Sequence, residues 1–114
     1  MKGSFVFIFR QGSSGNLTDE EQKRRTEEVR DWATQHIKDG HGLDPRVLDN
    51  ESRHLGDDAT HSESDGPVIA LNFIEATDFE DAVRMAKTHP GLRYGVRIEV
   101  RPWRDPRAQP AAAR

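Results

Sequence analysis

The chain has 114 residues, a formal net charge of −3 and 33% hydrophobic residues, which allows one domain with a single core. It contains no cysteine, which excludes disulfides and thiolate chemistry and fits a reducing cytoplasm. The negative charge, with no interleaved basic and aromatic pattern, argues against a nucleic-acid partner. No stretch has the length and apolarity of a signal peptide or a membrane span, so we expect a cytoplasmic protein that does not bind membranes.

Residues 2 to 10 form the first expected strand. Both of its faces are apolar, which is typical of a strand buried on both sides. The apolar residues are Phe5, Val6, Phe7, Ile8 and Phe9. The following loop, residues 11 to 16, lacks the Gly-Lys-Ser/Thr ending of a phosphate loop, so we interpret it as a connection.

A long helix is expected next. Thr18 and Glu21 have the spacing of a capping box, and Gly40 is the expected stop. Acid-before-base pairs four residues apart are typical of a solvated helix face. We therefore interpret the basic run of residues 23 to 25 as surface rather than as a binding patch. His36 lies on the inner stripe, where a core role is favoured over a functional one.

The middle of the chain is the least patterned part. Two short extended pieces, residues 46 to 48 and 52 to 55, predict a hairpin or an irregular edge strand. The polar loop that follows carries ligand-type side chains, but in no recognised metal-binding pattern, so we expect no metal there. These side chains are His54, Asp57, Asp58, His61, Glu63 and Asp65.

Residues 68 to 100 predict strand, helix and strand in one run. The first strand, residues 68 to 75, is again apolar on both sides. Thr77 is the expected cap of the helix, which residues 89 to 91 end with a His-Pro-Gly sequence. The last strand alternates strictly, with Tyr94, Val96, Ile98 and Val100 on one face and Arg97, Glu99 and Arg101 on the other.

This order predicts an α+β fold, a ferredoxin-like β-α-β-β-α-β sandwich with an antiparallel sheet. The first and third strands are expected at the centre, with both helices on one face of the sheet. The other face would then expose apolar side chains, and a second copy of the chain is the economical cover. We therefore expect a homodimer that closes an α+β barrel. Residues 1–103 would form the domain, and residues 104–114 a disordered tail.

Several segments resemble the YCII-related family, also called the YciI-like or DGPF-domain family. They are Phe5 to Arg10 before a glycine loop, the Thr18-Asp-Glu-Glu helix start, Glu51-Ser-Arg, Glu75-Ala-Thr-Asp-Phe-Glu-Asp-Ala, His89-Pro-Gly-Leu-Arg-Tyr-Gly and Ile98-Glu-Val-Arg-Pro-Trp. The resemblance covers residues 2 to 103 and implies a dimeric α+β barrel. It implies no general reaction, because the family has none established.

The sequence departs from this family in two places. Asp65-Gly66-Pro67 is similar to the Asp-Gly-Pro-Phe signature but runs directly into the next strand. The family's suggested acid-base pair has a histidine early in the first helix, where residues 24 to 26 of this chain are Arg-Arg-Thr. Asp39 matches the aspartate of that pair.

Three functional hypotheses follow. The first is a protein that binds or transforms a small polar molecule in a cleft of the homodimer, without a cofactor. Its ligand-binding candidates are Arg10, Asn72, Arg97 and Arg101, and its catalytic candidates are Glu99 as base, His89 as proton donor and Asp39. The second is a noncatalytic dimeric interaction or regulatory module, in which the charged row only protects a sheet edge. The third, cofactor-free oxygenation, rests on fold analogy.

Overall fold

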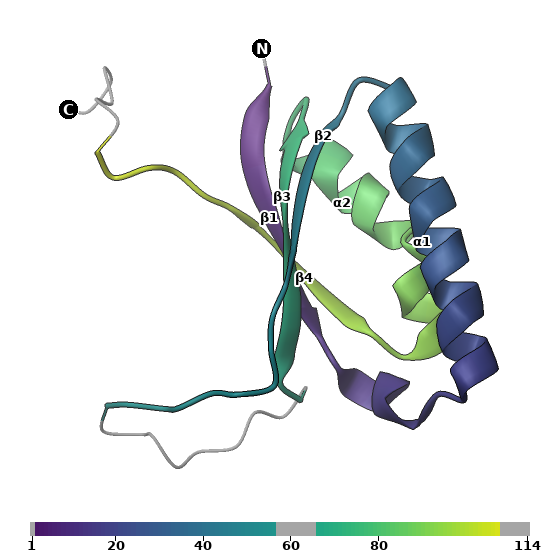
Figure 1. The fold of residues 1–114 in the computed structure, drawn as a ribbon. Helices are drawn as coiled ribbons and strands as arrows, with labels where there is room; N and C mark the ends of the chain where they lie inside the picture. Colours follow the sequence, from purple (N-terminus) through teal and green to yellow (C-terminus); the bar gives the residue numbers. More distant parts are fainter. Residues whose placement is uncertain (1, 57–65, 108–114) are drawn as a thin grey trace.

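The computed structural model describes residues 2–56 and 66–107, which form a small α+β fold (Figure 1). The elements in chain order are β1 (Gly3–Arg10), the 3₁₀ turn η1 (Gly12–Asn16), α1 (Asp19–Lys38), β2 (Gly42–Val47), β3 (Val68–Ala76), α2 (Phe79–Lys87), the 3₁₀ turn η2 (Pro90–Tyr94) and β4 (Arg97–Pro102).

The four strands form one antiparallel sheet in the order β2-β3-β1-β4. This order confirms that the first and third strands are central and the second and fourth lie at the edges. Both helices lie on the same side of the sheet, and the other side carries no layer of described residues (Figure 1). The arrangement is compatible with a ferredoxin-like fold.

The strand register assigns each side chain to one face of the sheet. Phe5, Phe7 and Phe9 of β1 pair with Ile74, Asn72 and Ala70 of β3, and directly paired residues share a face. The three phenylalanines are buried in the core with α1 and α2, so this is the helix face. The intervening residues form the opposite face, which we call the open face. Its apolar centre consists of Val6, Ile8, Leu71 and Phe73.

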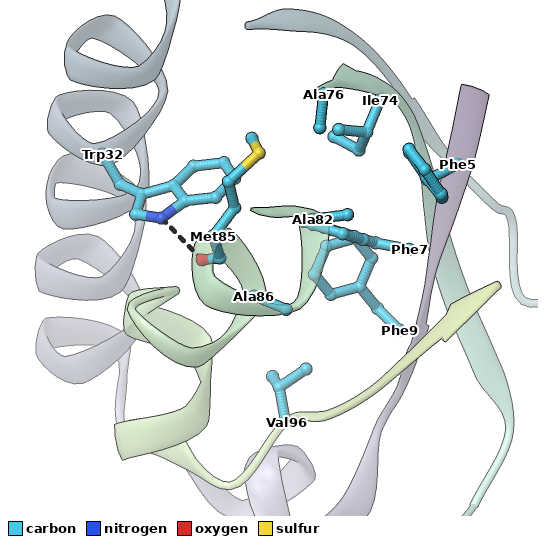
Figure 2. Close-up of a cluster of buried hydrophobic side chains, with 10 residues drawn as sticks. All are labelled: Phe5, Phe7, Phe9, Trp32, Ile74, Ala76, Ala82, Met85, Ala86 and Val96. Carbon is cyan, nitrogen blue, oxygen red and sulfur yellow. Dashed lines mark hydrogen bonds between the residues drawn. The ribbon is translucent and has the colours of Figure 1, made fainter. Parts of the chain in front are cut away.

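Trp32 is the residue that α1 contributes to the buried core (Figure 2). Its indole contacts Phe7, with ring centroids 6.5 Å apart. The indole Nε1–H donates to the carbonyl of Met85 at 3.3 Å and to the hydroxyl of Thr88 at 3.0 Å. Trp32 therefore joins α1, the sheet and the end of α2, while its polar N–H remains satisfied.

The expected helix start and end are confirmed. Thr18 is the N-cap of α1 and exchanges hydrogen bonds with Glu21 in a capping box. After α1, Gly40 adopts a φ of +96°, which favours glycine. The expected cap of the second helix is wrong by one residue, because Asp78 accepts from the N–H of Asp81.

The middle of the chain confirms the predicted edge strand but not the alternative of a hairpin. One edge strand, β2, replaces the two extended pieces, and residues 52 to 55 form no strand. Pro45 is tolerated in β2 because the strand lies at the sheet edge, where an N–H can be missing. Most of the polar loop, with Asp57 and His61, lies outside the described residues.

The chain after β4 is described as far as residue 107. Trp103 donates its backbone N–H to Ser4 and its indole N–H to Phe5, both at 3.1 Å. Residues 104 to 107 form no helix or strand, and the rest of the expected disordered tail lies outside the described residues. Within the described ranges, no helix has the length and apolar character needed to cross a membrane.

Candidate functional site

A cavity of about 450 Å³ lies on the helix face, between α1, η2 and the β2-β3 edge of the sheet. Its apolar lining includes Phe9, Val29, Val47, Ile69, Ala70 and Val96. Its polar lining includes Arg25 of α1, Asn72 of β3 and His89, which precedes η2. The volume is within the range of sites for small organic ligands. We call it the α1–β3 cavity.

His89 is buried at the inner end of this cavity. Its ring lies 5.0 Å from the ring of Phe9 and 4.7 Å from that of Trp32. Burial lowers the pKa of His89 to about 4, and the charges of Arg25 and His36 act in the same direction. The imidazole is therefore neutral at pH 7.

Local structure fixes the tautomer of this imidazole. Nδ1 of His89 accepts from the backbone N–H of Gly91 at 2.9 Å and so caps η2. In a neutral ring the proton must then be on Nε2. No described residue accepts this proton, and no buried side-chain nitrogen in the described part lacks a partner, so Nε2 reaches solvent. His89, a lining residue of the cavity, therefore has an Nε2–H donor with no partner among the described residues.

Asn72 presents a second donor. Its Oδ1 accepts from the backbone N–H of Asp44 at 3.0 Å, which fixes the orientation of the amide. The same edge contact explains why a polar residue stands in an otherwise apolar strand. The Nδ2 group makes no hydrogen bond to a described residue, although Asn72 as a whole is only 7% exposed.

Arg25 adds a positive charge to the same cavity. Its side chain is half-buried and pairs with no carboxylate among the described residues. The sequence interpretation of residues 23 to 25 as surface did not anticipate that Arg25 lines this cavity. The available signal was its spacing from Val29, Trp32 and His36, which places all four residues on one helix face.

The other residues predicted from the sequence do not join this cavity. Arg97, Glu99 and Arg101 lie on the open face, as their alternation predicted. Arg101 and Glu99 form an ion pair of 3.8 Å there, and Arg10 donates to the carbonyl of Gly66. The sheet thus separates the expected base, Glu99, from the expected proton donor, His89.

Asp39 lies at the far end of α1 from the cavity lining. It is the C-cap of the helix, and its carboxylate accepts from the side chain of Gln35 at 3.1 Å. Two histidines lie close by, and burial together with the neighbouring His41 lowers the pKa of His36. His41 in turn contacts Asp81 of α2, with its Nε2 2.9 Å from a carboxylate oxygen.

The open face has its own, smaller cavity of about 340 Å³ beside Trp103. Phe73 forms one wall, and its ring meets the Trp103 ring edge-on at a centroid distance of 5.6 Å. Glu75 and Asp44 supply the nearby charge, and both are acidic. This cavity offers no basic side chain for an anion.

Comparisons with known proteins add no identity. No protein-family model matches the chain, and no curated protein matches it either. The geometry of the described residues therefore carries the functional argument.

Proposed function

We propose that the α1–β3 cavity binds a small organic anion with an apolar body. The observation that carries this proposal is the convergence of three donors, Arg25, Asn72 and His89, on one apolar cavity. A guanidinium with two neutral donors suits a carboxylate or an enolate, whereas a cationic ligand would find no carboxylate among the described lining residues.

The apolar lining sets the rest of the ligand. Val29, Ile69 and Val96 surround the donors with aliphatic surface, and Phe9 contributes an aromatic ring. Burying a few methylene groups or a ring against this surface adds about 0.8 kcal/mol per CH₂ group. Aryl and short alkyl carboxylates meet both requirements.

The donors also limit the chemistry. Because Nδ1 of His89 is occupied and Nε2 carries the proton, the neutral ring acts as a hydrogen-bond donor rather than as a base at pH 7. Such a donor can stabilise negative charge on a bound oxygen, either in a ligand or in a reaction that develops an oxyanion. These donors therefore favour a binding function. Catalysis would require a ligand that is itself reactive.

A matched pair of arginine variants tests the proposal. Binding of benzoate, phenylacetate and pyruvate to the full chain would be measured by calorimetry and thermal shift. Arg25→Gln should weaken binding about 10-fold or more, as loss of a charge-assisted hydrogen bond does. Arg24→Gln, an exposed neighbour outside the cavity, should not.

Asn72→Asp gives a second test at the same site. The aspartate keeps an oxygen for the N–H of Asp44 but replaces the cavity donor with an acceptor. Anion binding should therefore fall while the fold is retained. If no carboxylate binds, or if the two arginine variants bind equally, the proposal fails.

We further propose that the open face forms the interface of a homodimer that closes an α+β barrel. Val6, Ile8, Leu71 and Phe73 form an apolar centre. Trp103 packs against Phe73 at one end of it, but no described helix or strand lies over it (Figure 1). Charged residues flank this centre on both edge strands. They are Arg97, Glu99 and Arg101 on β4 and Asp44 and Arg46 on β2.

An apolar centre with a charged rim is the usual anatomy of a protein interface. Phe73→Lys should therefore give a monomer in sedimentation equilibrium at micromolar concentration. Glu75→Lys changes charge on the same strand and face but not the apolar centre, so it should leave the dimer intact. A wild-type monomer under these conditions would remove the support for the barrel.

A further inference from the structure

Three side chains from three different elements meet where α1 ends. They are His36 in the last turn of α1, His41 just before β2 and Asp81 in the first turn of α2. Figure 1 shows this end of α1 and the start of α2 on the same side of the molecule. The group is separate from the α1–β3 cavity, and Trp32 lies between them, with its ring 4.7 Å from both His36 and His89.

The two imidazoles face each other through the same type of nitrogen. Nδ1 of His36 lies 3.2 Å from Nδ1 of His41. A tetrahedral metal ion with metal–nitrogen bonds of 2.0–2.1 Å holds two ligand nitrogens about 3.3 Å apart. The observed separation therefore suits two ligands of one ion.

The ring positions are compatible with a metal ligand pair, as they are with a bent hydrogen bond. A linear Nδ1–H···Nδ1 bond of this length would place the ring centroids about 5.5 Å apart. Two imidazoles on a tetrahedral ion place them about 5.2 Å apart. The observed distance between the centroids of His36 and His41 is 5.1 Å, with the ring planes at 61°.

Asp81 supplies the support that such a ligand requires. It lies 2.9 Å from Nε2 of His41, so the proton of this ring is held on Nε2 and the Nδ1 lone pair is left for a metal. The carboxylate is itself fixed, because Asp81 also accepts from the backbone N–H of Thr77 at 3.0 Å. A carboxylate behind a ligating imidazole is a common feature of metal sites.

We propose that His36 and His41 bind one divalent transition-metal ion through their Nδ1 atoms, with Asp81 orienting His41. Within the described ranges no third histidine, cysteine, aspartate or glutamate completes a metal-binding group. Water or a small anion therefore fills the remaining positions. Both rings are half-buried, so solvent reaches the site. Imidazole ligands suit Zn²⁺, Ni²⁺ and Cu²⁺. The tetrahedral nitrogen spacing matches Zn²⁺, and Cu²⁺, which prefers tetragonal coordination, serves as a spectroscopic probe of the same ligands.

Titration of the chelator-treated full chain with Cu²⁺ and Zn²⁺ tests this site. Calorimetry should show one ion per chain, and electron paramagnetic resonance of the Cu²⁺ complex should show two nitrogen ligands. His36→Gln and His41→Gln should each weaken binding at least 10-fold. His54→Gln removes an exposed histidine outside the group and should leave the affinity unchanged.

Asp81→Asn tests the supporting role separately. It should weaken metal binding about 10- to 100-fold, as loss of such a partner does elsewhere. Far-UV circular dichroism would verify that each variant is folded. Binding that is absent in the wild type, or lost in His54→Gln rather than in His36→Gln, would overturn the site. Unchanged affinity in folded Asp81→Asn would overturn the role of Asp81.

Discussion

Acidification should destabilise the fold through His89. This ring is 7% exposed, and its pKa in the folded chain is about 4 against an ordinary value of 6.5. Between these two pH values the unfolded chain binds a proton and the folded chain does not, so the free energy of unfolding falls as the pH falls. The gap corresponds to a loss of about 3 kcal/mol, most of which has occurred at pH 4 and which is complete below that pH.

The matched variant is His89→Asn. Asparagine keeps an acceptor for the N–H of Gly91 and is a favoured N-cap residue, but it does not titrate. Loss of the ring lowers the free energy of unfolding by the same amount at every pH. This loss therefore cancels when the values of one protein at pH 7 and pH 4 are subtracted.

Urea unfolding at pH 7 and at pH 4 provides the measurement. The wild type should lose about 3 kcal/mol more than His89→Asn over this interval, while other titrating groups contribute equally to both. Nuclear magnetic resonance titration of the His89 ring gives an independent value. An equal loss in the two proteins, or a ring that titrates near 6.5, would refute the argument.

Three further substitutions test the fold by urea unfolding at pH 7. Trp32→Phe removes the N–H that donates to Met85 and should cost about 1–3 kcal/mol; a neutral result would mean that this bond does not stabilise the fold. Thr18→Ala should cost about 1 kcal/mol by loss of the cap, and no change would contradict the capping box. Gly95→Ala should cost more than Gly56→Ala: both have positive φ, but of the two only the new Cβ at position 95 meets other described atoms, those of Ser13 and Ser14. Equal costs would argue against that contact.

The strand and helix pattern was accessible from the sequence because it depends on local periodicity. Alternation in residues 97 to 101 placed three charges on one face, and the register confirms this. The capping box at Thr18 located the start of α1 to the residue. The two strands that are apolar on both faces indicated the central positions, where burial is greatest, and the strand order confirms this.

The candidate site was less accessible, because it joins residues that are far apart in the chain. Asn72 and His89 were singled out as a polar residue in an apolar strand and as a titratable residue near a turn. Nothing local in the sequence showed that they share a cavity with Arg25, or that the sheet separates them from Glu99. The spacing of Glu21 and Arg25 predicted a solvated helix face, and this local pattern could not show that Arg25 also lines a cavity formed with distant segments.

Sequence alone determined the order of the elements, the two central strands and the charged alternation of β4, because each depends on neighbours within a few residues. Tertiary structure decided which donors meet. The neutral state of His89 required burial between Phe9 and Trp32, and the approach of His41 to Asp81 required α2 to pack beside the end of α1. Both depend on contacts between distant segments, which no local pattern records.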